Sequence, residues 1–411
     1  MTPSQSLSGL LDTGFVGRIS QTPFFTDEPK LQIYTARSGE AALEDRESAR
    51  PIGQGIAVDP ETAKLKAAAE LVERISLRRP ETGSFRRGKF GDFDRQLDPG
   101  ELFCYSEDQV PDREDALRRI RAEEIEWIEV NDCLGLGTLW APVELFYFAP
   151  SVPQSFRIRR ETNSTGAALG EIGTGRAFQS ALLEAVERDS VMGFWLLGGA
   201  VRRIVGLPSC VGELVDLLAR YRLECRLFDI TSDLGVPTAL SLTIDRTGLG
   251  PAVAVGSAAS LTLKQALRKA LLESISFRRS ARIRMAVDPI PQVREPSDIV
   301  SPETRAAYWF PLDRLPSLLT RFEPAQNTSF VEPNQIDPTT EAILEALSAR
   351  RMRVLASDIT PPAVRAQGFE VQRVLVPELH PLYLREASKA LFSAHYGAIP
   401  RDPDLLAHPF A

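Results

Sequence analysis

Histidine and cysteine are scarce in this sequence, and their positions exclude several kinds of site. The three histidines, His380, His395 and His408, all lie near the C-terminal end, so the body of the chain cannot build a histidine-based triad or a His-rich metal centre. The four cysteines are far apart and form no Cys-x-x-Cys pair. That spacing argues against a zinc site and a disulfide framework, and it is typical of a protein of the reducing cytoplasm.

Long apolar runs and the familiar nucleotide-binding motifs are also missing. The N-terminus lacks the positive start and apolar core of a signal peptide, and no run of about 18 apolar residues exists, so no membrane span is expected. A net charge of −7 leaves no basic footprint for nucleic acid. The Walker lysine motif and the glycine-rich loop of kinases are absent too. With 43% apolar and 25% charged residues, the composition is that of an ordinary soluble globular protein.

One eight-residue pattern occurs three times. The segments AKLKAAAE (63–70), AFQSALLE (177–184) and ALRKALLE (266–273) share alanine at the first and fifth positions and glutamate at the eighth. Their spacing predicts three similar helices. We interpret the glycines before each segment as turns that enter these helices, namely Gly53-Gln54-Gly55, the run from Gly166 to Gly175, and Gly256-Ser257.

Acidic residues on these helices suggest a shared site. A single Glu-x-x-Glu is more typical of a solvated helix face, but here the acid recurs, and the middle helix carries Arg188 on a face of small residues. If the helices converge, their charge density requires cations. Mg²⁺ prefers oxygen ligands and takes carboxylates together with phosphate oxygens, and the glycine turns would place helix N-termini near an anion. This predicts a nucleoside triphosphate site with more than one Mg²⁺, formed by Glu70, Glu73, Glu184, Glu187 and Glu273.

Strand and helix patterns alternate along the rest of the chain, without a linker that would divide it. We expect one large α/β domain over residues 1–411, in which strand–glycine turn–helix units surround the nucleotide site. Residues 1–52 are expected to be an N-terminal extension of short strands and loops packed on this domain. Residues 288–340 are interpreted as a Pro-rich surface connection, and residues 402–411 as an extended tail that contains proline. Asp-Ile-Thr occurs after a strand at 229–231 and again at 358–360, where it is typical of a turn.

The order of these motifs resembles that of the YcaO family, from about Gly53 to Ala411. The resemblance is carried by the Glu-x-x-Glu-Arg of the first helix, STGAALG…ALLEAVERD, FDITSDLGVP, GSAA…ALRKALLESISFR, VLVPEL and the final HPF. It implies an ATP- and Mg²⁺-dependent enzyme that phosphorylates backbone amides of a ribosomally made precursor peptide. Cyclodehydratases of the family form thiazoline and oxazoline rings from Cys, Ser or Thr. Thioamide or amidine formation, and an ATP-binding accessory role, remain open alternatives.

The resemblance also implies roles for individual residues. All five glutamates would hold Mg²⁺ on the ATP phosphates. The nucleotide would be contacted by Ser164, Thr165, Gly166, Arg188, Lys269, Arg278 and Gln54, although many members have Lys at the Gln54 position and Arg at the Lys269 position. Many members end in a PxPxP-like tail, whereas this chain ends in HPFA. We expect the tail to lie beside the ATP site and to orient the peptide or accept its proton, through His408, Pro409 and Ala411.

Partners are implied as well. The 52 residues before the first motif are too few for a domain that binds the leader of a precursor peptide, so we expect a separate E1-like, leader-binding partner. No flavin or Rossmann signature is present, so oxidation of azolines to azoles would need a flavin dehydrogenase in the same complex. The complex is expected to be cytoplasmic, with no nucleic acid and no membrane.

Overall fold

The computed structural model describes residues 2–39, 51–80, 83–135, 137–148, 165–199, 201–287, 290–331, 339–402 and 405–410. Three units organise the fold, and in each a strand leads into a long helix that packs on it. They are β3 (Ile52–Ala57) with α2 (Pro60–Ser76), β7 (Thr165–Glu171) with α5 (Arg176–Leu197), and β11 (Val253–Ala259) with α7 (Leu263–Val287). The predicted α/β class and its repeated strand–helix units are confirmed.

Each unit belongs to a different sheet. The first sheet is antiparallel and joins β1 (Val16–Gln21), β2 (Gln32–Ser38) and β3. The second has the order β4-β5-β13-β14-β7, with β6 added on β5; its further strands are β4 (Phe85–Gly88), β5 (Ile125–Asp132), β6 (Thr138–Pro142), β13 (Leu355–Asp358) and β14 (Phe369–Leu375). The third has the order β11-β10-β9-β8-β12, completed by β8 (Arg202–Gly206), β9 (Leu223–Asp229), β10 (Thr238–Asp245) and β12 (Gln326–Ser329).

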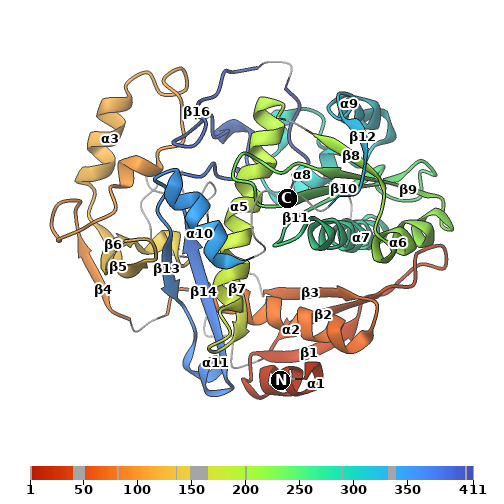
Figure 1. Ribbon diagram of the computed structural model, residues 1–411, viewed down its shortest axis with the longest axis horizontal. Helices are drawn as coiled ribbons and strands as arrows, with labels where there is room; N and C mark the ends of the chain where they lie inside the picture. Colours follow the sequence, from red (N-terminus) through yellow and green to blue (C-terminus); the bar gives the residue numbers. More distant parts are fainter. Residues whose placement is uncertain are drawn as a thin grey trace.

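Helix α5 lies at the centre of the molecule, between the second and third sheets (Figure 1). Its residues enter two cores, because Leu182 and Val186 pack with β14 while Val191 and Trp195 pack with β10. The remaining helices are shorter: α1 (Pro3–Asp12), α3 (Arg113–Ala122), α6 (Ser209–Ala219), α8 (Pro302–Tyr308), α9 (Leu315–Thr320), α10 (Thr340–Ala349) and α11 (Pro362–Ala366). Within the described ranges, no helix has the length and apolar character that crossing a membrane requires. A small pair, β15 (Phe392–Ser393) and β16 (Gly397–Ala398), completes the fold.

Gly173 and Gly175, both with positive φ, form the predicted turn into α5, but the glycines at the start of each repeat serve a different purpose from the one predicted. Gly53 and Gly256 lie inside β3 and β11 rather than in turns, and Gly166 lies inside β7. A Cβ at these positions would come within 2.1, 2.3 and 1.9 Å of the backbone oxygens of Ala67, Ala270 and Ala181 respectively. Only glycine lets the strand backbone approach a helix this closely. The helix residue in each of these contacts is the alanine at the fifth position of the repeat. The repeated pattern therefore reflects the packing of a strand on a helix.

Two further expectations were wrong. Residues 290–331 are not a surface connection, because Tyr308, Trp309, Phe310 and Phe322 are buried in one core with Trp195. The N-terminal segment contains helix α1 and two full strands of the first sheet, rather than short strands and loops alone. The Asp-Ile-Thr segments do form turns, as expected: in each, the aspartate accepts from the backbone N–H and hydroxyl of the threonine two residues later.

Candidate active site

The glutamate at the eighth position of each repeat makes the same contact in all three units. The Glu70, Glu184 and Glu273 carboxylates accept hydrogen bonds from the backbone N–H groups of Gln54, Ala167 and Ser257, at 2.7, 2.8 and 2.8 Å. Each donor directly follows the strand glycine, whose close approach brings the N–H within reach of a side chain in the middle of the helix. The acids therefore lie about 12–15 Å along each axis from the helix N-termini. The expected contribution of those N-termini to the site is not found.

The acidic side chains of the three helices converge, as the repeat predicts. Burial is the largest cause that raises the pKa values of Glu70, Glu73, Glu187 and Glu273, the last to about 8. The negative charge of Glu184 adds to the increase in all four. Carboxylates from α2, α5 and α7 therefore share one region, where their negative charge is only partly compensated.

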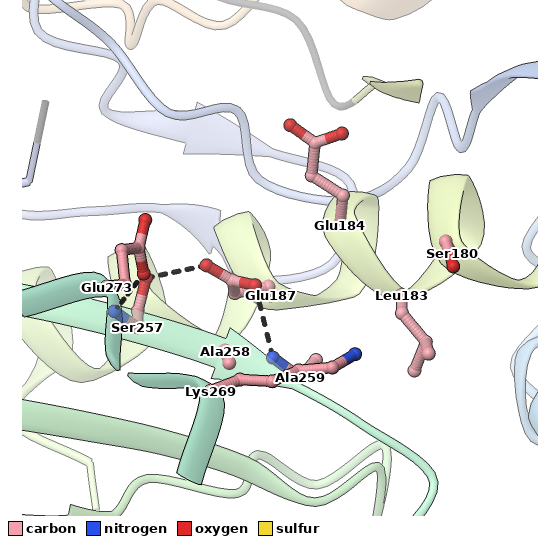
Figure 2. Close-up of a pocket in the computed structure, with 9 residues that line it drawn as sticks. All are labelled: Ser180, Leu183, Glu184, Glu187, Ser257, Ala258, Ala259, Lys269 and Glu273. Atoms are coloured by element: carbon pink, nitrogen blue, oxygen red, sulfur yellow. Dashed lines mark hydrogen bonds between the residues drawn. The ribbon is translucent and has the colours of Figure 1, made fainter. Parts of the chain in front are cut away.

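A cavity of about 310 Å³ opens on one side of this region, between α5, β11 and α7 (Figure 2). Glu187 is fixed at its wall: one carboxylate oxygen accepts from the Ser257 hydroxyl at 2.6 Å and the other from the Ala259 N–H at 3.1 Å. Lys269 lines the same cavity. Desolvation lowers the pKa of Lys269 and the charge of Glu187 opposes that change. An acid and a cation therefore share one cavity.

Arg188 and Gln54 support the site through side-chain contacts. Arg188 donates to Glu184 and to the carbonyl oxygen of Thr165, both at 2.7 Å, so it joins α5 to the start of β7. The Gln54 side-chain oxygen accepts from Ser276 at 2.9 Å and from Ser280 at 3.0 Å. Ser276 occupies the place of the second acid in the third helix, so the first and third units are linked there by a neutral contact. Ser164 and Ala411 lie outside the described residues.

Arg278 does not reach the acidic region. It is only 3% exposed and forms ion pairs with Glu28 and Asp245, on another face of α7 from Glu273. Five residues separate these two positions, which turns them about 140° apart on a helix. Arg278 therefore ties the loop before β2 to α7, and its predicted contact with the nucleotide finds no support in the geometry.

The tail is built into the protein rather than frayed. His408 is fully buried, its Nε2 lies 2.7 Å from the carbonyl oxygen of Tyr383, and its own carbonyl accepts from Arg305 at 2.9 Å. Pro409 is buried as well, and Phe410 stacks edge-on against Trp195 at the C-terminal end of α5. Burial holds the pKa of His408 well below its usual range. None of these tail residues lines the cavity, so a proton-accepting role for His408 stays a prediction.

Arg373 is a residue of the acidic region that no sequence motif predicts. This residue of β14 is buried, and it interacts electrostatically with Arg188, Glu184 and Glu73. It stands far from the repeat in the sequence, in a strand pattern without a distinguishing motif, and only the pairing of β14 with β7 brings it to the site. A buried network beside Arg188 was also missed, in which Asp189 accepts from His395 and Tyr396, both at 3.0 Å.

The acidic residues of the site suit a Mg²⁺ ion that is also bound to phosphate groups. In the described ranges, no three His, Cys, Asp or Glu side chains are close enough to form a metal cage by themselves. The acidic side chains offer only carboxylate oxygens, and Mg²⁺ commonly combines one or two such ligands with water and phosphate oxygens. Their raised pKa values indicate the excess negative charge that a divalent cation would neutralise.

An α/β scaffold whose cavity combines carboxylates with a lysine suits Mg²⁺ together with a phosphate-bearing ligand. A family model described as YcaO cyclodehydratase, ATP- and Mg²⁺-binding, matches residues 54–380. The chain belongs to the YcaO family, and its expected cofactors, ATP and Mg²⁺, are those of the family. No curated protein sequence matches the chain.

Several solved structures share the fold. YcaO from Methanopyrus kandleri, bound with AMPPCP and Mg²⁺, is 18% identical with a TM-score of 0.62, over 92% of this chain and 91% of that chain. A heterocyclase in complex with substrate and cofactor is 18% identical with a TM-score of 0.70, over 94% of this chain. The present chain spans 53% of that heterocyclase's length. The E. coli microcin synthetase McbBCD complex is 14% identical with a TM-score of 0.63, over 88% of each chain.

Proposed function

We propose that this protein uses ATP and Mg²⁺ to phosphorylate backbone amides of a ribosomally synthesised precursor peptide, forming thiazoline or oxazoline rings from Cys, Ser or Thr. The observation that carries the proposal is the convergence of Glu70, Glu184 and Glu273. Each is held by the backbone N–H next to a strand glycine. Glu184 and Glu273 also border a cavity with Lys269 and Glu187. Membership of the YcaO family supports the same chemistry.

The proposed reaction conserves all atoms. The thiol or hydroxyl of the peptide loses its proton and attacks the preceding amide carbon, and the amide oxygen receives the γ-phosphoryl group of ATP with release of ADP. Phosphate then leaves with that oxygen while the amide nitrogen loses its proton and a C=N bond forms. When bound, Mg²⁺ would neutralise part of the negative charge of the ATP phosphates. The five glutamates would hold the metal in position and Lys269 would offer a cation to phosphate oxygens across the cavity, while Arg188 keeps Glu184 oriented from β7. The rigid strand–helix units keep these groups in place during the transfer.

We propose that the protein works in a cytoplasmic complex. An E1-like partner would bind the leader of the precursor peptide, and a flavin dehydrogenase would oxidise azolines to azoles. The names of two structural neighbours, a heterocyclase with substrate and a microcin synthetase complex, support this arrangement. The four cysteines are free, which suits a reducing compartment. Thioamide formation, amidine formation and an accessory role in modifying another protein are alternatives within the same fold.

Reconstitution tests the proposal. The full chain is combined with ATP, Mg²⁺, an E1-like protein and a Cys-, Ser- or Thr-rich peptide encoded beside its gene, and the peptide is analysed by mass spectrometry. We expect loss of one water per ring and loss of thiol alkylation at each modified cysteine. Without the partner, ATP should be consumed slowly and the peptide left unmodified.

Each alternative has its own signature in this experiment. Replacement of oxygen by sulfur would identify a thioamide, and loss of water with every thiol still reactive would fit an amidine. Efficient modification by the isolated chain would contradict the need for a partner. An unmodified peptide in the presence of the complete set of components would contradict the ring-forming proposal.

A further inference from the structure

Arg373 is in β14, the strand that pairs with β7. The backbone of β7 donates a hydrogen bond to Glu184 of α5. In the antiparallel pair of β14 and β7, Arg373 stands directly opposite Ala167, whose N–H donates to Glu184. Figure 1 shows the two strands side by side next to α5. Arg373 is 8% exposed, and its Nε donates to the carbonyl oxygen of Leu145 at 3.3 Å. Among the described residues, nothing forms a hydrogen bond or ion pair with its two terminal nitrogens.

This arrangement sets Arg373 apart from other arginines that are equally buried. Arg305 pairs with Glu386 and donates to two carbonyl oxygens, Arg278 pairs with two carboxylates, and Arg279 donates to two carbonyl oxygens. The terminal nitrogens of Arg373 are not among the fully buried polar atoms that lack a partner, so they remain accessible to a ligand although most of the side chain is buried. Incomplete pairing of a buried cation indicates that its partner is a ligand.

The neighbours of Arg373 indicate what that ligand is. Burial, and then the positive charge of Arg188, lowers the pKa of Arg373 to about 10, while Glu184 and Glu73 favour its charged form. Arg188 is already engaged with Glu184 and with Thr165. Once Mg²⁺ binds the two glutamates, two guanidinium groups and a divalent cation would occupy one space. Phosphate oxygens that arrive with the metal would give the terminal nitrogens of Arg373 acceptors of the kind that guanidinium groups bind most strongly.

Arg373 also places a positive charge on a second side of the acidic region. The two α5 acids face different sheets, because Glu184 accepts from β7 while Glu187 accepts from Ser257 and Ala259 of β11. Lys269 lies on the β11 side, in the cavity, and Arg373 lies on the β7 side. A phosphoryl group beside the Mg²⁺ ligands would thus have Lys269 of α7 on one side and Arg373 of β14 on the other.

We infer that Arg373 donates its two terminal nitrogens to the γ-phosphoryl group of ATP. This inference rests on the function proposed above and adds a residue that contacts the transferred group. As that group moves, the bond between its phosphorus and the ADP oxygen breaks and a bond to the amide oxygen forms. Arg373 keeps its protons throughout and stabilises the charge on the equatorial oxygens.

Nucleotide affinities test the inference, because ADP lacks the group that Arg373 would contact. Binding of AMPPCP and of ADP, each with Mg²⁺, is measured by calorimetry for the full-length wild-type chain, Arg373→Gln and Arg373→Lys. The matched control is Arg365→Gln, which removes a half-exposed arginine paired with Asp358. For Arg373→Gln we expect AMPPCP to bind about 10-fold more weakly or worse, the size typical of a lost charged hydrogen bond, while ADP affinity changes about 2-fold at most.

Arg373→Lys should retain part of the preference for AMPPCP, and Arg365→Gln all of it. The melting temperature of Arg373→Gln should stay near that of the wild type, because the removed cation is incompletely paired. Equal losses for both nucleotides together with a lower melting temperature would overturn the inference in favour of a structural role. An unchanged ratio of the two affinities would overturn it as well. A wild-type chain that binds neither nucleotide would contradict the proposed function itself, and the inference with it.

Discussion

At the scale of single residues, some positions of the site can be predicted from the sequence and others cannot. Glu70, Glu184 and Glu273 could be predicted because they occupy the same place in a repeated pattern. Arg373 could not, because its contribution depends on the pairing of two strands about 200 residues apart in the chain. Arg278 shows the opposite case: it stands in a motif, yet its side chain forms buried ion pairs with Glu28 and Asp245 that the motif does not predict.

The acids of α5 allow the sharpest test at this scale. Glu184→Gln or Glu187→Gln should reduce Mg²⁺-dependent ATP turnover by about 100-fold or more, since about 3 kcal/mol of charge stabilisation by the metal would be lost. Without Mg²⁺ the melting temperature should be unchanged or higher, because a neutral amide relieves repulsion among the acids. Glu345→Gln, on the exposed face of α10, is the control. Near-normal turnover of either α5 variant would contradict the assignment of that glutamate as a metal ligand.

At the scale of elements, the strand–helix unit explains the repeat better than the turn that was first inferred. Glycine followed by a helix fits either a turn or a strand that needs close contact, and sequence alone does not separate the two. The alanine at the fifth position favours the second interpretation once the geometry is known, because in all three units its backbone oxygen faces a strand glycine. The Pro-rich segment 288–340 misled for a related reason: its helices are short, and its aromatic residues carry no regular period.

Gly166→Ala tests the role of these strand glycines. A Cβ there would meet the backbone oxygen of Ala181 at 1.9 Å and the Glu184 Cβ at 2.8 Å, so strand and helix must separate. We expect a loss of about 3 kcal/mol or more in the free energy of unfolding, together with weaker binding of Mg²⁺ and ATP as Glu184 shifts.

Gly212→Ala in α6 is the matched control for this substitution, because a Cβ there has nothing within 4 Å. It should raise the free energy of unfolding by about 0.5–1 kcal/mol, since alanine favours a helix interior. Urea denaturation of both variants measures the two effects. If Gly166→Ala proved as stable as the wild type, the close approach of strand and helix would not be a requirement.

At the scale of the whole molecule, the last residues of the chain close the core around the end of α5. The indole of Trp195 donates to the carbonyl oxygen of Leu406 at 3.0 Å, and Phe410 covers the same ring. A tail in an extended conformation was predicted, but its burial was not, because terminal residues are usually frayed. The N-terminal segment belongs to the body for a similar reason, since Glu28 pairs with Arg278 and Arg282 of α7.

Phe410→Ala measures what the tail contributes. The side chain is 6% exposed, and loss of a buried phenylalanine costs about 3 kcal/mol or more, so the melting temperature should fall clearly. Leu249→Ala, at a residue 61% exposed, should change stability by less than about 0.5 kcal/mol. Peptide modification by Phe410→Ala, measured well below its melting temperature, then separates stability from chemistry. A rate that fell there with the affinity for ATP unchanged would support the predicted role of the tail in orienting the peptide.

The three equivalent glutamate contacts also make cofactor binding a property of the whole architecture. One carboxylate comes from the helix of each strand–helix unit, so a cation that binds all three connects parts of the chain that belong to three different sheets. By mass action, a ligand at 100 times its dissociation constant adds about 2.7 kcal/mol to the stability of the folded state. All three units would share this increase in stability. If one of them unfolded locally, the affinity of the other two for the same ion would decrease.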